Sequence, residues 1–530
     1  PLSFATVAPS FVTGAPFPPE PEPSEIPEGY NEDPPPPVPT GTLRGTLSPT
    51  GSGSVLDVGT PGVIPSASMS RAPLAHTKSV DDPVLFFRSV GYGSGGGTWL
   101  DPSGATADDN VIGSFNGPVA FSTDGGATFA TQNVTSIFPN QDSSGNPIDG
   151  GFCCDQVIMY LPQIDRFVWL LQYRRALLPG DDPDEPTGPN RYRLAAASPA
   201  QFISSGGTAW TYWDLTSGLF GFGGNSWMDY PDLSLGSNFL YLSADVIGEG
   251  GLFVARIPLA DIQGGGVIHI GFTDPTLGSM AWGSHLVQNV HETAYWAGHN
   301  NTSSIRVFSM SEDDDFYSWR DVNIDSWLNT DYASVTPTGR NWLGFGFPGS
   351  GIIGGTRLAR THFVDDYVVE SDELWFAWSA GRGGGFPEPY VRMVTIDMFD
   401  ESVTGQHQIW NEEIAFAYPA LAANSQGEVG LALAFGGNDA HSNFAVGIWG
   451  DFVVYFAELA DASVGRFGDY FGIRRHWPNE GLFSAFGLWY SQTNPATADD
   501  CDPSSECRTN RHHILFGRES ALEPPPPPPS

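Results

Sequence analysis

Two short segments concentrate the residue types that could do chemistry. Residues 150–156 read GGFCCDQ, so a pair of adjacent cysteines precedes an aspartate. Residues 468–481 read GDYFGIRRHWPNEG, which combines acidic, phenolic, guanidinium and imidazole groups. Such groups can exchange protons with a substrate or hold its carboxylates. From these segments we expect catalytic roles for Asp155, Asp469, Tyr470, Arg474 and His476.

The cysteine pair does not have the spacing of a zinc site or of a thioredoxin-type redox site, which both need two intervening residues. The two other cysteines of the chain, Cys501 and Cys507 in CDPSSEC, are spaced for a small disulfide loop in an exported protein. We expect the pairs Cys153–Cys154 and Cys501–Cys507. The alternative is a cross-link between the two segments. A bridge between adjacent cysteines would place Asp155 rigidly.

The elements that must position these residues are short strands. Among the 530 residues, glycine (64), proline (45) and aromatic residues (13%) are abundant and charged residues are few (16%), a mix that suits strands and turns. Between about residue 81 and residue 518, apolar runs form seven groups that begin near residues 84, 151, 227, 281, 356, 412 and 466. About four strands in each group predict an all-β, seven-bladed β-propeller. Six or eight blades, or a pair of β-sandwiches, are the alternatives.

The two ends of the sequence have a different composition. Residues 1–80 contain PFPPEPEPSEIPEGYNEDPPPPVPTG, and residues 519–530 end in PPPPPPS. Proline-rich, acidic segments bury too little apolar surface to fold alone. We expect extended spacers at both ends of a propeller of residues 81–518. Self-assembly through these proline-rich ends is the alternative.

Charge narrows the classes of partner. The formal net charge is −37, which repels phosphates and excludes general nucleic-acid binding. No apolar stretch is long enough to span a membrane. The opening residues, PLSFATVAPS, suggest a mature chain whose leader has been removed. We expect a secreted or cell-surface protein from a bacterium.

One motif carries a family resemblance. Residues 122–129, STDGGATF, follow the apolar run PVAF and resemble the Asp-box of sialidase-like β-propellers. The resemblance implies a hairpin turn on the outer rim of a blade, in which Asp124 bonds turn amides and Phe129 packs beneath. In that family the box marks the fold and has no catalytic role. The family also carries an Arg-Ile-Pro motif before its first box, whereas Arg256-Ile257-Pro258 lies after the box here. We interpret it as an ordinary strand.

The first strand of each propeller blade lines a central channel, and ligands usually bind at one mouth of that channel. The polar residues that lead each group are therefore candidates for ligand binding. They could instead cap strand ends and bond to neighbouring blades. The ligand-binding candidates are Asp229, Tyr230, His285, Arg360, His362 and Tyr418, with Asp232, Gln288 and His291 beside them.

The function expected from these features is binding or cleavage of an extracellular glycan, by a hydrolase or a polysaccharide lyase. The alternative is a non-catalytic surface or assembly protein with proline-rich tethers. No cofactor is expected. The acidic loops at 181–185 and 311–315 could hold Ca²⁺, although neither has EF-hand spacing.

Overall fold

The computed structural model describes residues 2–13, 48–49, 54–57, 82, 84–96, 100–142, 145–182, 186–344, 349, 351–364, 367–451, 453–456, 460–492 and 507–522. The expected all-β class is confirmed. The described helices are short: α1 (Pro199–Ser205), α2 (Leu259–Gly264) and the 3-10 turns η1 (Val134–Ser136), η2 (Ser217–Phe220), η3 (Pro275–Ala281) and η4 (Glu519–Leu522). The proline-rich segments at 16–41 and 523–530 lie outside the described residues.

The described strands form seven antiparallel sheets. The first consists of β6 (Ser103–Ala107), β7 (Asn110–Ser114), β8 (Val119–Ser122) and β9 (Ala130–Gln132). The second contains β10 (Val157–Leu161), β11 (Arg166–Gln172), β12 (Arg191–Ala197) and β13 (Ala209–Thr216). The third contains β14 (Trp227–Leu235), β15 (Phe239–Ile247), β16 (Gly251–Pro258) and β17 (Ile268–Phe272). The fourth consists of β18 (Thr293–Asn301), β19 (Ser304–Ser311) and β20 (Tyr317–Asn323).

The remaining three sheets continue this meander along the chain. The fifth consists of β21 (Gly354–Val364), β22 (Tyr367–Ala380), β23 (Tyr390–Asp397) and β24 (Ser402–Ile409). The sixth contains β25 (Ile414–Ala423), β26 (Val429–Gly437), β27 (Ala440–Ile448) and β28 (Val453–Phe456). The seventh contains β29 (Gly472–Arg475), β30 (Phe483–Gln492) and β31 (Cys507–Arg518).

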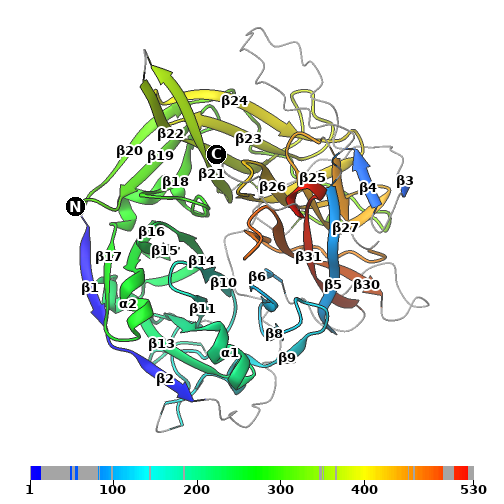
Figure 1. Ribbon diagram of the computed structural model, residues 1–530. Helices are drawn as coiled ribbons and strands as arrows, with labels where there is room; N and C mark the ends of the chain where they lie inside the picture. The colour runs from blue at the N-terminus through cyan, green and yellow to red at the C-terminus, as the bar shows by residue number, and fades with distance from the viewer. Residues whose placement is uncertain are drawn as a thin grey trace, which may run out of the picture.

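Strands from the N-terminal part of the chain complete several of these sheets. β5 (Val84–Gly96) pairs with β31, so the seventh sheet joins the two ends of the ring (Figure 1). The prediction that a sheet begins near residue 84 is therefore wrong, because β5 is the last strand of the seventh sheet. β1 (Ser3–Val7) pairs with β17 and β2 (Ser10–Thr13) with β13. β4 (Ser54–Asp57) pairs with β28 and with the short β3 (Ser48–Pro49).

The sheets are arranged around a central axis, as in a β-propeller (Figure 1). Six of the seven sheets place their first strand toward the axis, and these strands contact one another: β14 with β10, β10 with β6, β6 with β29, β29 with β25, and β25 with β21. At the fourth sheet the segment 286–288 takes this position, because Leu286 bridges to Trp296 of β18 and Gln288 bridges to Thr356 of β21. Side chains join these strands directly, since the Ser103 hydroxyl accepts the amide of Ile158 at 3.0 Å. The first strands thus surround a channel whose lining is fixed by the ring.

The hydrophobic core lies between neighbouring sheets. Met228 and Leu242 of the third sheet pack with Leu170 and Trp213 of the second. Phe471 and Phe483 pack with Phe444 of the sixth sheet. Face-to-face burial of alternate apolar residues drives this packing. The aromatic side chains of these strands therefore help to fill the space between neighbouring sheets.

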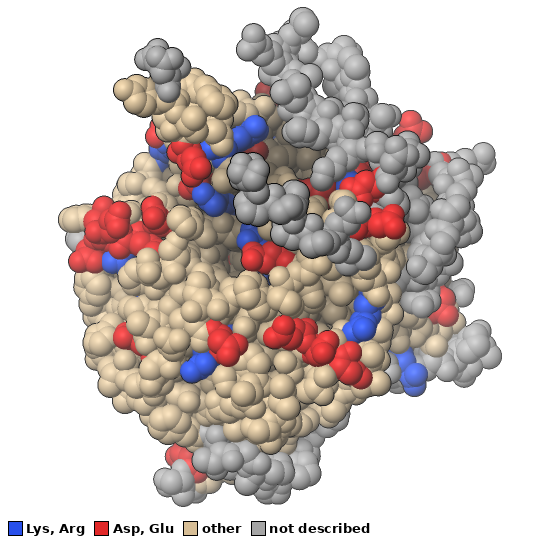
Figure 2. Space-filling model, in the orientation of Figure 1, with Lys and Arg blue, Asp and Glu red and all other residues tan. Residues whose placement is uncertain are grey.

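Charged side chains are scattered on the surface shown in Figure 2, with wide uncharged areas between them. Within the part of the chain that the structure describes, no helix is long and apolar enough to cross a membrane.

Candidate functional site

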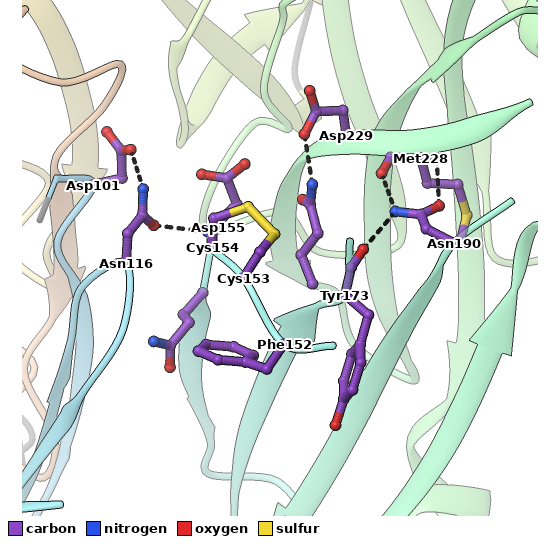
Figure 3. Close-up of a disulfide and its surroundings, with 12 residues drawn as sticks. Asp101, Asn116, Phe152, Cys153, Cys154, Asp155, Tyr173, Asn190, Met228 and Asp229 are labelled. Carbon is purple, nitrogen blue, oxygen red and sulfur yellow. Dashed lines mark hydrogen bonds between the residues drawn. A yellow bond between two sulfur atoms is a disulfide. The ribbon is translucent and has the colours of Figure 1, made fainter. Parts of the chain in front are cut away.

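Four aspartates converge where the chain enters the first strands of four sheets. Asp101 and Asp155 each lie two positions before the first residue of β6 and of β10, Asp229 lies near the start of β14, and Asp469 precedes β29. Figure 3 shows the carboxylates of Asp101, Asp155 and Asp229 in a row. We call this end of the channel, defined by these four aspartates, the acidic end.

A buried asparagine links two of these aspartates. Asn116 donates a hydrogen bond from Nδ2 to Oδ2 of Asp101 at 2.8 Å and accepts the Asp155 amide on Oδ1 at 2.7 Å (Figure 3). The Asp469 amide donates to Oδ1 of Asp101 at 2.8 Å. Gln172 donates to Asp229 at 2.6 Å. Neutral donors therefore hold the carboxylates of Asp101 and Asp229, while Asp155 is held through its backbone amide.

The acidic end favours protonated carboxyl groups. Burial, then the neighbouring carboxylate of Asp469, raises the pKa of Asp101 to about 7. Burial and the carboxylates of Asp229, Asp101 and Asp469 raise the pKa of Asp155 well above its usual value. Burial also raises the pKa of Asp229. Asp469 differs from the other three because it forms an ion pair with Arg466, whose side chain is 40% exposed. The site thus combines acids that keep a proton with a carboxylate beside a positive charge.

A disulfide joins the adjacent Cys153 and Cys154 and forms one side of the acidic end (Figure 3). The Cys153 amide donates to the carbonyl of Gln172 at 3.1 Å, which ties the bridge to β11. Asp155 follows at a φ of 42°, a left-handed conformation that non-glycine residues seldom adopt. The bridge therefore lies next to a constrained carboxylate. Cys507 is also disulfide-bonded, and Cys501 lies outside the described residues.

Aromatic groups form another side. The rings of Tyr230, His285 and Tyr470 pack together, with centroids 4.7 to 5.7 Å apart. Tyr230 donates to the carbonyl of Asp469 at 3.1 Å. Tyr470 is 5% exposed, and its hydroxyl has no hydrogen-bond partner among the described residues. Burial and the carboxylates of Asp155 and Asp101 raise its pKa. Tyr418 is buried nearby and its amide donates to Ser379.

The channel continues from the acidic end to a larger pocket. A narrow cavity lies between Tyr470, His285, Asp232 and Arg474. Nη2 of Arg474 lies 3.7 Å from Oδ1 of Asp232. Burial lowers the pKa of Arg474. Gln288 and Arg474 also line the next cavity, of about 490 Å³, around the C-terminal ends of the first strands. We call this second cavity the basic pocket, defined by Arg357, Arg474 and Arg475 in its lining.

The predicted site residues separate along this channel. The structure brings Asp155, Asp469, Tyr470, Asp229, Tyr230, His285 and Tyr418 to the acidic end or its wall. Arg474 lies in the middle and His476 lines the basic pocket. His476 bonds to Thr106 and Ser484, and burial lowers its pKa to about 4.

Arg360 and His362 do not reach either cavity. β21 is long, and only its first part, up to Arg357, lines the channel. Arg360 pairs with Glu373 of β22, and His362 lies 3.0 Å from Asp397 of β23. The hairpin of β21 and β22 thus continues beyond these two cavities, and ligand binding by Arg360 and His362 stays a prediction.

Solved structures with some similarity include glycan-acting enzymes. The leech intramolecular trans-sialidase has a TM-score of 0.37 and 11% identity, over 64% of this chain and 65% of that chain. The α-L-arabinanase of Penicillium chrysogenum has a TM-score of 0.33 and 9% identity, over 81% and 98%. A protein of unknown function from Dyadobacter fermentans has a TM-score of 0.38 and 8% identity, over 82% and 99%. No protein-family model matches this sequence. No curated protein matches it either.

The two motifs of the family resemblance lie away from the acidic end. Residues 122–129 form the turn between β8 and β9, where Asp124 accepts the amide and the hydroxyl of Thr128 at 2.9 and 2.7 Å. Arg256 lies in β16, the third strand of its sheet, and pairs with Asp315. Neither motif contributes a side chain to the carboxylate cluster.

Three residues of the acidic end were missed in the sequence: Asp101, Asn116 and Arg466. A signal for Asp101 exists, because Asp101-Pro102 precedes the first strand β6, while Tyr230-Pro231 and Tyr418-Pro419 lie within the first strands β14 and β25. All three residues before proline have positive φ. At Tyr230 and Tyr418 the strand register shifts, as in a β-bulge that redirects a side chain. Asn116 and Arg466 have no local pattern that distinguishes them.

The predicted acidic loops do not form a metal cluster within the described residues. Asp315 pairs with Arg256, and Asp181 accepts hydrogen bonds from Leu178 and Thr187. In the part of the chain that the structure describes, no group of three or more histidine, cysteine or acidic side chains could hold a metal ion. Calcium binding by the loops at 181–185 and 311–315 stays a prediction.

Proposed function

We propose that this chain is a seven-bladed β-propeller, with each of the seven sheets as one blade, and that it hydrolyses glycosidic bonds at the acidic end. The observation that carries the proposal is that two neighbouring carboxyl groups differ in how strongly their surroundings favour the protonated form. Asp155 keeps a proton because desolvation and the neighbouring carboxylates raise its pKa, whereas Asp469 is paired with Arg466. Glycosidases need such a pair, in which one carboxyl group donates a proton and the other acts as a carboxylate.

Each group has a role in this reaction. The Asp155 carboxyl is half-buried and donates its proton to the glycosidic oxygen as the bond to the leaving sugar breaks. The Asp469 carboxylate assists the attack at the anomeric carbon, as a base for water or as a nucleophile. The buried Tyr470 hydroxyl donates to a sugar hydroxyl. Asp101 and Asn116 act as positioning residues, because their contacts are with Asp469 and Asp155.

The test is a screen of purified full-length protein against plant, fungal and animal oligosaccharides, with reducing ends as the readout. We expect turnover of at least one glycan by the wild-type protein, and a loss of about 10³-fold or more in Asp155→Asn and in Asp469→Asn. The matched control is Asp321→Asn, because Asp321 pairs with Arg306 on the surface of β19 and β20, away from both cavities. Wild-type turnover that survives both substitutions would remove the proposal.

Secretion, a bacterial source and self-assembly through the proline-rich ends stay predictions. The pairing of β1 and β2 within the same chain shows that residues 3–13 extend its own sheets. No described contact favours the assembly alternative over glycan hydrolysis.

A further inference from the structure

The basic pocket lies apart from the four carboxylates. The carboxylates lie at the N-terminal ends of the first strands. The pocket is lined by Tyr160 and Arg475 near the C-terminal ends of β10 and β29, and by Arg357 in the first part of the longer β21. Its volume of about 490 Å³ is within the range of small-molecule sites. The pocket is therefore large enough for one or two sugar rings and does not share the acidic end's lining.

The charge of this pocket contrasts with the rest of the molecule. The chain has 60 acidic and 23 basic residues, yet the lining contains three arginines and one acidic residue, Glu480. His476 is neutral near pH 7, because burial lowers its pKa to about 4. Each guanidinium has one carboxylate beside it, namely Asp372 for Arg357, Asp232 for Arg474 and Glu480 for Arg475. The lining thus gathers three guanidinium groups in a strongly acidic protein, and the donors that these pairs leave over suit an anionic ligand.

The arginines keep donors for a ligand. Arg475 donates from Nε to the carbonyl of Ala423 and from Nη1 to Glu480, at 2.9 and 2.8 Å. Arg474 Nε is buried and has no hydrogen-bond partner among the described residues. Arg357 contacts Asp372 through Nε. Guanidinium groups with remaining donors match the planar geometry of a carboxylate.

Two aromatic rings complete the lining. The centroids of Tyr160 and Trp477 are 6.2 Å apart, with an angle of 44° between the rings, and both side chains are half-buried. Aromatic faces of this kind pack against the C–H faces of sugar rings while polar groups at the edge bond to hydroxyls. We propose that the basic pocket binds a sugar that carries a carboxylate, with the carboxylate at Arg475 and Arg357 and the ring on Trp477 and Tyr160.

The test measures binding without turnover, so it is independent of hydrolysis at the acidic end. Full-length Asp155→Asn protein is titrated at low salt with glucuronate, galacturonate and digalacturonate, and with glucose and galactose as neutral partners. We expect at least one of the acidic sugars to bind about tenfold more tightly than its neutral partner. Arg475→Met should weaken that binding about tenfold. Glu480→Gln should strengthen it, because the competing carboxylate is removed while the arginines stay.

The control is Arg306→Met, since Arg306 pairs with Asp321 on the surface of β19 and β20. It should leave binding unchanged. If Arg475→Met does not fold, the gain in Glu480→Gln decides alone. Equal affinity for acidic and neutral sugars, no binding of any acidic sugar, or weaker binding in Glu480→Gln would each overturn the inference.

Discussion

Replacement of Asn116 by aspartate tests the electrostatics of the acidic end directly. Asn116 is 4% exposed, and its Nδ2 is 2.8 Å from Oδ2 of Asp101. Asn116→Asp keeps the shape and the acceptor for the Asp155 amide, but it places a second carboxyl group against Asp101. Two carboxyl groups at this distance must share a proton. The variant should therefore fold at acidic pH and lose stability as the pH rises.

The size of the effect follows from the pKa of Asp101. This pKa is raised to about 7 in the folded protein, so its contribution to stability is fully present below the unfolded pKa and is lost as pH rises through the folded value. Between pH 5 and pH 9, Asp101 alone therefore lowers the free energy of unfolding of the wild-type protein by about 3 kcal/mol. A pair that keeps its shared proton up to pH 9 loses about 5 kcal/mol over the same window. The variant should therefore lose about 2 kcal/mol more than the wild-type protein.

The assay is urea unfolding followed by tryptophan fluorescence at both pH values. Buried histidines such as His476, whose pKa burial lowers to about 4, titrate in this window only in the unfolded state, and their contribution cancels in the difference between variant and wild type. Asn301→Asp is the control, because Asn301 is exposed and its side-chain oxygen accepts hydrogen bonds from the amide and hydroxyl of Ser303. If Asn116→Asp has the same pH dependence as the wild-type protein, the proposed carboxylate cluster is refuted.

Three further predictions concern the bridge, the ring closure and the reaction. In Cys153→Ser/Cys154→Ser, turnover should fall about tenfold or more, because Asp155 loses the bridge that supports it. The free energy of unfolding should change by less than about 1 kcal/mol, because a bridge between adjacent residues constrains the unfolded chain very little. Unchanged turnover would contradict this prediction. Arg518, at the end of β31 in the closing sheet, pairs with Glu428 at 2.9 Å and with Asp451 at 2.6 Å. Arg518→Met should therefore lower the free energy of unfolding by about 3–5 kcal/mol, whereas Arg306→Met, which breaks an exposed pair, should lower it by about 1 kcal/mol or less. Equal losses in the two variants would contradict a buried network. The pH profile of kcat/KM should fall at neutral or alkaline pH, because burial and neighbouring carboxylates raise the pKa of the proton donor Asp155; a fall with a midpoint near the ordinary aspartate pKa would contradict that assignment.

The all-β class could be predicted from the sequence because strand length and aromatic content are local properties. The entry of most sheets was also visible, since a polar turn precedes each apolar run. The role of β5 could not be predicted, because its pairing with β31 joins residues more than 400 positions apart in the chain. Only ring closure decides that β5 ends the last sheet and does not begin the first.

The candidate site was predictable in part. Asp155, Asp469 and Tyr470 were found because they lie in the two dense segments and precede first strands. The position of Arg360 and His362 outside both cavities could not be predicted, because the sequence pattern of one strand does not show how far the β21–β22 hairpin extends. Asn116 was missed because an asparagine between two sheets becomes recognisable only when both Asp101 and Asp155 are in place.

The most direct test of the central claim compares leaving groups in Asp155→Asn. Once a cleaved glycan is known, its aryl glycosides are prepared with a dinitrophenyl and with a plain phenyl leaving group. If the Asp155 carboxyl donates the proton, the substitution should reduce hydrolysis of the phenyl glycoside about 10²–10³-fold and leave the dinitrophenyl glycoside close to the wild-type rate. An equal loss on both substrates, or no loss on either, would contradict the account.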